Sequence, residues 1–372
     1  MVHMGIFGGK QDTIGLDIGK SSIIGVQLGG RAPAAVLRAY HERNIPEGLV
    51  FEGEVVDTDG LASELKAFMR ESGMKGKVVN LGVGNQKVIV RNIETPEMSD
   101  DELRGAIEFQ AQDYIPIPVA EAVLDFQVVA RYADQDGVAK QRVLLVAAQR
   151  DMVDRFLLAA TKAGLRVGGI DASAFGLIRA LSPSVSFVDQ GTEEGRPLGV
   201  MNISSSVSSL VVAVDGVPKF TRTISFAHDQ FKRVLVEHQG VEPEDAEKLI
   251  EGIGLPGAVE PDLDTYNPVT VGEVHGVLGA AADELADEIR RSIDYFQSQD
   301  YTTQVDHLVL TGRGALLRNL DSYLSESLGL HVNVGNPLLK VSEVANSIDG
   351  EVLMSVAPRL AVAIGLALDE VD

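Results

Sequence analysis

A short polar segment near the start of the chain contains residue types that can bind a phosphate group. Residues 15–22 read GLDIGKSS, so that Asp17 stands at the end of an apolar run and a glycine, a lysine and two serines follow it. Backbone N–H groups and hydroxyls of a tight turn donate to phosphate oxygens, and a lysine adds a point charge. A carboxylate at this place suits Mg²⁺, which keeps much of its own water shell. The segment therefore predicts a phosphate-binding turn between two strands.

A second polar turn lies about half a chain further on. Residues 202–206 read NISSS and also separate two aliphatic, β-branched runs. Aligning Asn202 with Asp17 gives an offset of 202 − 17 = 185 residues. We interpret this offset as an internal duplication of two related α/β halves, each of which opens with strand, polar turn and strand. Either turn taken alone is explained equally well as an ordinary hairpin turn, because Gly and Ser are common there.

Two further segments have the composition of ligand-binding elements. Residues 246–249 read AEKL within a predicted helix. Residues 311–315 read TGRGA between a strand predicted at 307–310 and a helix predicted at 316–328. A strand followed by a glycine turn and a helix lets backbone N–H groups approach a ligand closely, so residues 311–315 are a third candidate binding loop.

The composition restricts the class of protein and the kind of partner. The 372 residues include 54 Asp or Glu and 32 Lys or Arg, which gives a formal net charge of −22. Such a charge argues against a chain-wide contact with nucleic acid or with an anionic lipid surface. The absence of cysteine excludes thiol nucleophiles, disulfides and thiolate zinc sites, and it fits a reducing cytoplasm.

Two segments bear on membranes. The apolar stretch 352–368 is interrupted by Pro358 and Arg359. It falls short of the roughly 20 clean residues that a spanning helix needs, so we expect a core helix. Residues 1–10 contain one lysine and no apolar run of signal-peptide length, so we expect no secretion signal.

The order of predicted elements suggests three parts. We expect a first half at 13–92 and 166–196, a subdomain inserted into it at 93–165, and a second half at 197–372. The polar segment 182–196 would link the two halves.

Two helices are predicted from clear local signals. Ser99 and Glu102 have the spacing of a capping box at the start of a helix that runs to about Tyr114. A long amphipathic helix is expected from about Ala281 to Gln299.

In their order and spacing, the four polar segments resemble the two phosphate loops, the ribose-contacting helix and the adenosine loop of the actin-like ATPase superfamily. Within that superfamily, the chain resembles the PilM family of type IV pilus assembly proteins, which are relatives of the division protein FtsA. This second resemblance covers residues 13–368. It is carried by PEMS at 96–99, EFQ at 108–110, DYIP at 113–116, DF at 125–126, LLVAA at 144–148 and EIRRSIDYF at 288–296.

The resemblance implies an α/β fold of the actin-like bilobed type. Two ribonuclease-H-like halves, with a small α+β subdomain inserted in the first, would clamp ATP and Mg²⁺. Asp17 would hold Mg²⁺ through water, Lys20 would meet the phosphates, and Glu247 would accept hydrogen bonds from the ribose hydroxyls. The full set of expected nucleotide-binding residues is Asp17, Gly19, Lys20, Ser21, Ser22, Asn202, Ser204, Ser205, Ser206, Glu247, Gly312, Arg313 and Gly314.

The resemblance also implies a partner. In the PilM family the inserted subdomain helps to receive the short cytoplasmic N-terminal peptide of PilN, a bitopic membrane protein. The family works as a cytoplasmic platform component, as a ring or other homo-oligomer, joined to the inner-membrane assembly and the pilus motor. The expected contact residues are Phe109, Tyr114, Ile115 and Pro116, although the spacing of Phe109, Tyr114 and Phe126 is more typical of an ordinary core. A basic tail would suit the charge of −22, so we expect attachment to the membrane through protein and no direct insertion.

Several positions depart from the pattern of an intact ATPase. Asn202 and Ser204 stand where the second phosphate loop usually has Asp and Gly, which removes a charge and adds a Cβ where backbone should approach phosphate. Arg313 interrupts a loop that usually reads Gly-Gly-Gly-Ala and would either stack on the base or block it, and Ile250 replaces a lysine of the ribose helix. We therefore expect weak ATP binding and low or absent hydrolysis, and we assign no catalytic residue. Asn202→Asp is the most informative reverse substitution.

Two alternatives stay open at the level of sequence. An FtsA-like division protein would share the fold, but that family ends in a basic amphipathic membrane helix, whereas this sequence ends in LALDEVD. A small-molecule kinase of the same superfamily would need a catalytic carboxylate facing a substrate pocket, and the scattered acids are more typical of a solvated surface. The seven histidines form no metal pair at helical spacing, so they receive no role.

Overall fold

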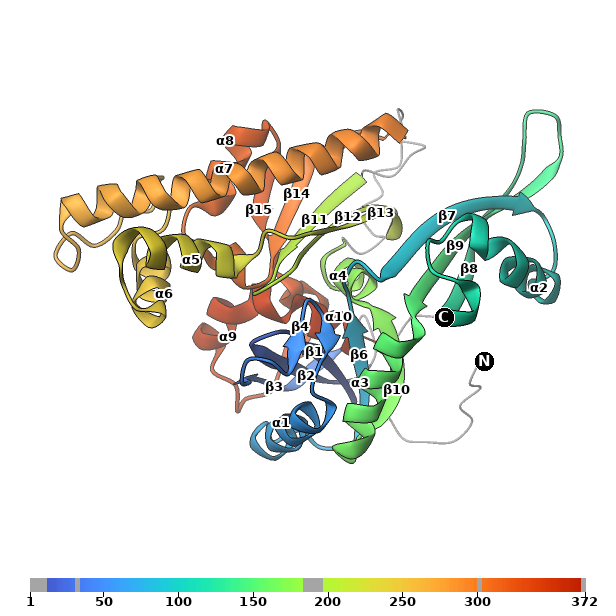
Figure 1. Ribbon diagram of the computed structural model, residues 1–372, viewed down its shortest axis with the longest axis horizontal. Coiled ribbons are helices and arrows are strands. Elements are labelled where there is room, and N and C mark those ends of the chain that lie inside the picture. Colours follow the sequence, from blue (N-terminus) through green and yellow to red (C-terminus); the bar gives the residue numbers. More distant parts are fainter. Residues whose placement is uncertain (1–11, 31–33, 183–196, 300–302, 369–372) are drawn as a thin grey trace. The chain divides into compact units, whose positions relative to one another are not determined.

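The computed structural model describes residues 12–30, 34–182, 197–299 and 303–368 (Figure 1). The chain divides into two compact units. The first comprises residues 1–83, 157–181 and 335–372, and the second comprises residues 84–156 and 182–334. From residue 183 onward, the linker predicted at 182–196 lies outside the described residues.

The first unit is built on a six-stranded mixed sheet in the order β10-β6-β1-β2-β3-β16. Its strands are β1 (Thr13–Ile18), β2 (Ser22–Gly29), β3 (Val36–Asn44), β6 (Val78–Val83), β10 (Arg166–Ala172) and β16 (Glu343–Val344). β1, β2 and β3 form an antiparallel meander, and β6 and β10 continue the sheet in parallel with β1. β2 is buried along its whole length, in agreement with its aliphatic, β-branched composition.

The remaining elements of the first unit are a small hairpin and helices. They are β4 (Val50–Phe51), β5 (Glu54–Val55), α1 (Thr58–Glu71), α4 (Ser173–Leu181), η5 (Pro337–Lys340), α9 (Gly350–Val356), η6 (Ala357–Leu360) and α10 (Ala361–Ala367). Helix α3 (Arg150–Lys162) passes from the second unit into the first.

The C-terminal apolar stretch forms part of the core of the first unit. Among the described residues, one helical stretch, Gly350–Ala367, is long and apolar enough to cross a membrane, with a mean hydropathy of 1.5, and 61% of it is buried in the structure. α10 packs on β1, β2, β6 and α4, as the predicted core helix requires. The sequence-based division assigns residues 335–372 to the second half. The structure places them in the first unit, because β16 pairs in parallel with β3 and α10 covers its sheet.

The second unit contains a five-stranded sheet in the order β13-β12-β11-β14-β15. Its strands are β11 (Pro197–Ile203), β12 (Ser208–Val214), β13 (Val217–Ile224), β14 (His307–Thr311) and β15 (His331–Val334). The helices of this part are α5 (His228–Gln239), α6 (Pro243–Gly252), α7 (Pro268–Gln299), η4 (Arg313–Leu316) and α8 (Leu320–Leu328).

The two sheets share one topology. In each, an antiparallel meander of three strands is continued by two parallel strands next to the first strand of the meander, namely β6 and β10 in one sheet and β14 and β15 in the other. The predicted alignment places β1 on β11 and β2 on β12, so that Asp17 and Asn202 are both the second-to-last residue of their strands. The offset of 185 residues therefore corresponds to a repeated fold.

Helix α7 is longer than predicted. It begins at Pro268, thirteen residues before Ala281, and runs along the second unit (Figure 1). Asn267 precedes it and accepts a hydrogen bond from the N–H of Thr270 at 2.9 Å through its side chain. Glycines at 272, 276 and 279 weaken the helical pattern of the first turns in the sequence, but buried Val271, Val274 and Leu278 continue the apolar face.

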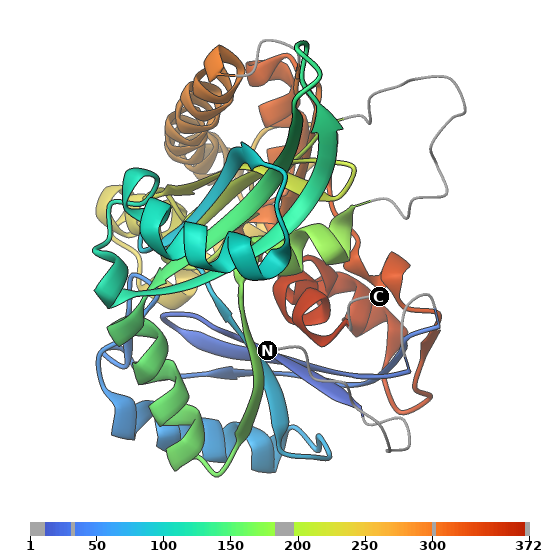
Figure 2. The ribbon, with the colours of Figure 1, turned by 90° about the vertical axis from the view of Figure 1, so that its right-hand side faces the viewer.

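The sequence predicts a subdomain at 93–165 inserted in the first half, whereas the structure groups residues 84–156 with the second unit. We keep the name inserted subdomain for this segment, which a three-stranded antiparallel sheet and one helix form. The strands β7 (Val88–Pro96), β9 (Ala139–Gln149) and β8 (Ala122–Ala133) lie in the order β7-β9-β8, and α2 (Asp100–Gln110) crosses one face of the sheet (Figure 2). Two short helices, η1 (Ala111–Asp113) and η2 (Val119–Glu121), follow α2. The predicted capping box at Ser99 and Glu102 is present in both of its hydrogen bonds.

Candidate functional site

The turn between β1 and β2 is the first predicted phosphate loop. The N–H of Gly19 donates to the carbonyl oxygen of Ser22 at 2.9 Å, and the carbonyl oxygen of Ser21 accepts from the N–H of Ile45 at 2.9 Å. A Cβ added at Gly19 would have its nearest contact, the carbonyl oxygen of Ser22, at 3.5 Å. The packing of the turn therefore does not itself require a glycine at position 19. The space beside its backbone is open to a ligand.

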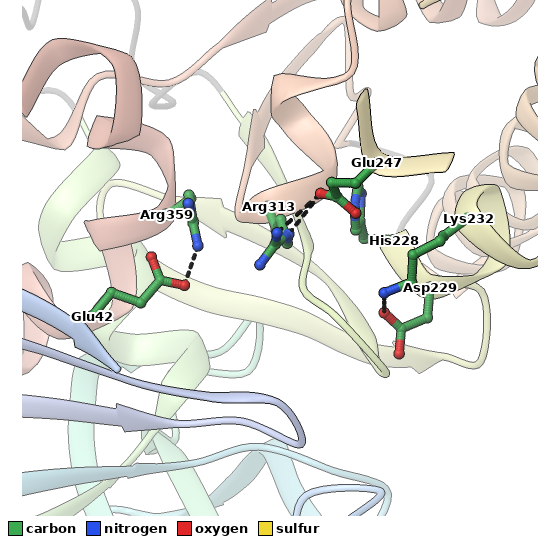
Figure 3. Close-up of polar contacts among 7 residues, drawn as sticks. All are labelled: Glu42, His228, Asp229, Lys232, Glu247, Arg313 and Arg359. Atoms are coloured by element: carbon green, nitrogen blue, oxygen red, sulfur yellow. Dashed lines mark hydrogen bonds and ion pairs between the residues drawn. The ribbon is translucent and has the colours of Figure 1, made fainter. Parts of the chain in front are cut away.

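Asp17 is a partly buried carboxylate at the end of β1. No hydrogen bond or ion pair joins it to another described residue. Asp17 pairs with Ile24, and Ile24 pairs with Glu42 of β3, so the two carboxylates lie on one face of the sheet, two strands apart. Burial and the charge of Glu42 raise the pKa of Asp17 to about 6. Arg359 of η6 donates to Glu42 (Figure 3), so the charge of Glu42 has a partner and that of Asp17 has none among the described residues. A divalent cation bound at Asp17 would stabilise its ionised form.

The second predicted phosphate loop joins β11 to β12 and is bound to the start of α5. The carbonyl oxygen of Ser204 accepts from the N–H of His228 at 2.9 Å, and that of Ser205 accepts from the N–H of Asp229 at 3.0 Å. The hydroxyl of Ser204 donates to the carbonyl oxygen of Val207 within the turn. The side chain of Ser204, which the sequence assigns to the nucleotide, therefore stabilises the turn itself.

The loop after β14 packs directly on the second turn. Gly312 has a φ of 83°, and a Cβ there would lie 2.4 Å from Oδ1 of Asn202. A Cβ at Gly314 would lie 2.3 Å from Cγ2 of Ile203. Both glycines are thus explained by packing on the end of β11. The structure brings the predicted adenosine loop and the predicted second phosphate loop into contact.

Glu247 of α6 lies at the centre of a polar cluster with His228 and Arg313 (Figure 3). Oε1 of Glu247 accepts from Nε and Nη2 of Arg313 at 3.1 and 3.0 Å. Nε2 of His228 lies 3.0 Å from Oε1 and 3.2 Å from Oε2, and it carries the proton because a carboxylate only accepts. Burial alone would raise the pKa of Glu247, but the hydrogen bond and charge of His228 and the charge of Arg313 outweigh it and lower the pKa to about 2. Glu247 is therefore an ionised acceptor.

The side chains of these loops fit a phosphate and a cation better than they fit a ribose. The described part of the chain contains no group of three or more His, Cys, Asp or Glu side chains that could hold a metal ion. A hydrated Mg²⁺ shared with phosphate oxygens needs only one or two protein carboxylates, so Asp17 suits that role. On the ribose side, Oε1 of Glu247 is occupied by Arg313 and His228. Ile250, at the position of the expected lysine, is 1% exposed and lies in the core.

The predicted partner-binding residues separate into surface and core. Phe109 on α2 is 91% exposed and Tyr114 is 38% exposed, and Pro116 is also exposed. Ile115 is 3% exposed and packs in the core of the inserted subdomain, so its side chain is not available to a partner. The interpretation of the three aromatic residues as ordinary core is wrong for Phe109 and Tyr114, which are exposed. Phe126 is partly buried and packs against the core of the inserted subdomain.

Comparison with known proteins identifies the family. The sequence matches the family model described as type IV pilus assembly protein PilM over residues 15–371. The chain belongs to the PilM family. The predicted resemblance to type IV pilus assembly proteins is thereby confirmed.

Solved structures of PilM and of more distant proteins have the same fold. A chain of a PilM–PilN type IV pilus biogenesis complex is similar with a TM-score of 0.79 and 27% identity, over 96% of this chain and 98% of that chain. The ethanolamine utilization protein EutJ from Carboxydothermus hydrogenoformans is similar with a TM-score of 0.54 and 15% identity, over 97% and 90%. MreB5 of Spiroplasma citri bound to ADP is similar with a TM-score of 0.51 and 13% identity, over 95% of this chain and 94% of that chain. These similarities confirm the predicted actin-like α/β fold.

The sequence analysis of this PilM-family chain missed three residues that contact or face the candidate site residues. His228 is 2% exposed and contacts Glu247 from a different helix, 19 residues away in the chain. Glu42 and Arg359 meet beside Asp17 although 317 residues separate them. Contacts of this kind depend on the packing of distant elements, so no local spacing marks them.

A buried amide without hydrogen-bond partners lies on β9 of the inserted subdomain. Gln141 on β9 is 0% exposed, and neither Oε1 nor Nε2 has a hydrogen-bond partner. Thr95, directly opposite on β7, is 3% exposed with its hydroxyl also unpartnered. Because burial of an amide without partners costs free energy, Gln141→Met should raise the free energy of unfolding by about 1–2 kcal/mol.

Chemical denaturation followed by circular dichroism measures this change. Gln127→Met is the matched control, because Gln127 is exposed on β8 and the same substitution there should change stability by less than about 0.5 kcal/mol. A lower denaturation midpoint for Gln141→Met than for the wild type would contradict the prediction.

Proposed function

We propose that this chain is a cytoplasmic component of the type IV pilus assembly platform that binds the cytoplasmic N-terminal tail of a PilN-like inner-membrane protein. The observation that carries the proposal is the similarity, over 96% of this chain and 98% of the other, to a chain of a PilM–PilN complex at 27% identity. A net charge of −22 favours a partner tail with basic residues and disfavours direct binding to anionic lipid. Attachment to the inner membrane would then depend on the protein partner.

The exposed aromatic residues of the inserted subdomain are the part of the surface that best suits a peptide. Phe109 on α2 is 91% exposed, and Tyr114 follows α2 at 38% exposure. Aromatic side chains are frequent energetic centres of interfaces because they bury a large area with little loss of conformational freedom. Exposure of a phenylalanine to water brings no benefit to folding, so a contact in the assembled complex accounts for it better than the stability of the free chain.

Phe109→Ala should weaken binding of the partner peptide about tenfold or more, because it removes a large apolar contact. The measurement is isothermal titration calorimetry with the full chain and a synthetic peptide from the cytoplasmic N-terminus of a PilN-like membrane protein. Tyr114→Ala should weaken binding in the same direction. Val269→Ala is the control, since Val269 is 70% exposed on α7, outside the inserted subdomain. Unchanged affinity for both aromatic variants would remove this surface from the interface.

We propose in addition that the chain binds ATP with Mg²⁺ weakly and hydrolyses it slowly or not at all. Support comes from the open turn at Gly19 and the unpartnered carboxylate of Asp17, which suit phosphate and cation. The neutral side chain of Asn202 and the engaged carboxylate of Glu247 argue for low affinity and low turnover. Partner docking, and not hydrolysis, would then be the main activity of the protein.

A further inference from the structure

The ribose position of the proposed nucleotide site contains an intramolecular ion pair. Oε1 of Glu247 accepts from Nε and Nη2 of Arg313 at 3.1 and 3.0 Å, and it lies 3.0 Å from Nε2 of His228. Within the described part of the chain, Oε2 has a single polar contact, with Nε2 of His228 at 3.2 Å. A carboxylate oxygen accepts about two hydrogen bonds. Oε1 therefore has no capacity left, and only Oε2 can accept from a further donor.

Both sides of this ion pair are held in place by packing. Glu247 stands on α6 between Ala246 and Ile250, which are 0% and 1% exposed. Arg313 lies between two glycines whose positions are fixed against the end of β11. The side chains of Arg313 and Glu247 are 28% and 19% exposed, so that water screens their attraction less than it screens a surface pair. The pair is a defined feature of the free protein.

His228 adds a further restraint on Glu247. Its side chain is 2% exposed, its N–H donates to the turn at Ser204, and its ring donates to the carboxylate. Nδ1 of His228 is buried without a hydrogen-bond partner among the described residues, so the ring is held by the contact of Nε2 with Glu247. When Arg313 leaves, His228 therefore keeps the carboxylate in place as an acceptor.

We propose that Arg313 determines nucleotide affinity and sugar specificity by competing with the ribose hydroxyls for Glu247. This inference rests on the proposed nucleotide site and identifies the residue that limits it. While the ion pair is closed, Glu247 offers a sugar only Oε2, so a ribose and a deoxyribose are bound almost equally well. Binding that uses both carboxylate oxygens requires the ion pair to open. The apparent affinity is then the intrinsic affinity multiplied by the fraction of the protein in which the ion pair is open.

Removal of the Arg313 side chain should therefore strengthen binding. With the ion pair closed in about nine molecules of ten or more, Arg313→Ala should bind Mg·ATP about tenfold more tightly than the wild type. It should also prefer ATP over 2′-deoxy-ATP by about tenfold, whereas the wild type should prefer ATP by less than about threefold, because Oε1 becomes free to accept from the ribose.

Isothermal titration calorimetry with the full chain, Mg²⁺ and either ATP or 2′-deoxy-ATP measures both quantities. Arg318→Ala is the matched control: Arg318 lies in the same connection between β14 and α8 but donates to the carbonyl oxygen of Glu260, and its variant should bind like the wild type. Circular dichroism establishes that each variant is folded.

The possible outcomes separate the inference from the function on which it rests. Tighter binding and a larger ATP preference in Arg313→Ala, with Arg318→Ala unchanged, support the proposal. Measurable binding with an equal or weaker affinity in Arg313→Ala, or with an unchanged ATP preference, overturns it and leaves the nucleotide site standing. Absence of binding to every folded variant overturns both.

Discussion

Gly365→Ala should lower the free energy of unfolding of the first unit by about 3 kcal/mol or more. A Cβ at Gly365 would lie 1.8 Å from the carbonyl oxygen of Gly176 and 2.4 Å from its carbonyl carbon. Both atoms belong to the backbone of α4, so the clash can be relieved only if α4 and α10 move apart. That movement would also weaken the hydrogen bond from Nε of Arg179 to the carbonyl oxygen of Gly365, which is 2.8 Å long.

Urea denaturation followed by circular dichroism is the suitable measurement, because the chain contains no tryptophan. Gly350→Ala is the matched control in the same helical stretch. A Cβ at Gly350 meets no atom within 4 Å, so this change should alter stability by less than about 1 kcal/mol. Equal denaturation midpoints for Gly365→Ala and the wild type would mean that α4 and α10 are not packed through their glycines.

The parts of the fold that depend on local sequence signals could be predicted. The two strand-turn-strand segments were visible because β-branched runs flank the polar turns at 19–21 and 204–207, and the structure has hairpins there. The capping box at Ser99 and Glu102 was visible because its two residues are three positions apart. Each of these signals lies within one or two adjacent elements.

The parts that depend on long-range packing could not be predicted. β16 pairs with β3 across about 300 residues, and the pairing involves only Glu343 and Val344, too short a run to show a pattern. The close packing of α10 on α4 at Gly365 and Gly176 could not be predicted for the same reason. In the sequence, each glycine alone indicates only a position that destabilises a helix. The boundaries assigned to residues 335–372 differ from the structure for this reason.

The sequence named candidate residues for the site but did not predict the contacts among them. The sequence placed Glu247 and Arg313 in one site as separate ligands of a nucleotide, and the structure pairs them with each other. Whether an arginine faces a ligand or a carboxylate of its own chain depends on the distance between α6 and the loop after β14, which the spacing of 66 residues does not encode. His228 was missed because its role depends on the packing of α5 against α6.

Asp17→Asn should raise the free energy of unfolding at neutral pH. Burial and the charge of Glu42 raise the pKa of Asp17 from 3.8 to about 6. In the unfolded chain the carboxyl ionises near 3.8, so the folded state binds the proton more tightly and stability is lost as the pH rises from about 4 to about 6. Above pH 6 the full penalty is present. Since Asp17 is partly exposed, this penalty amounts to about 1–3 kcal/mol.

An asparagine has the same shape and no charge to desolvate, so it should remove the penalty above pH 6 and change little at pH 4. Thermal unfolding followed by circular dichroism between pH 4 and pH 8 tests the sign and the pH range together. Asp294→Asn is the control for the general effect of removing one negative charge from an acidic chain. Asp294 is exposed on α7 and forms no ion pair with another residue that the structure describes. A stability gain for Asp17→Asn that is equal at pH 4 and pH 8 would contradict the proposed cause.

This pH dependence bears on the role of Asp17 as well as on its energetics. The carboxylate of Asp17 has no hydrogen bond or ion pair with another described residue, and the charge of Glu42 two strands away repels it. It therefore costs the first unit stability at neutral pH, and an asparagine would avoid that cost. Strongly perturbed pKa values cluster at functional sites, so the raised pKa of Asp17 fits a role in binding a ligand. Mg²⁺ bound with a nucleotide would remove the repulsion from Glu42 and return the lost stability. Addition of Mg·ATP should therefore raise the unfolding temperature of the wild type at pH 8 and have little effect on Asp17→Asn, because the asparagine offers the cation no charge.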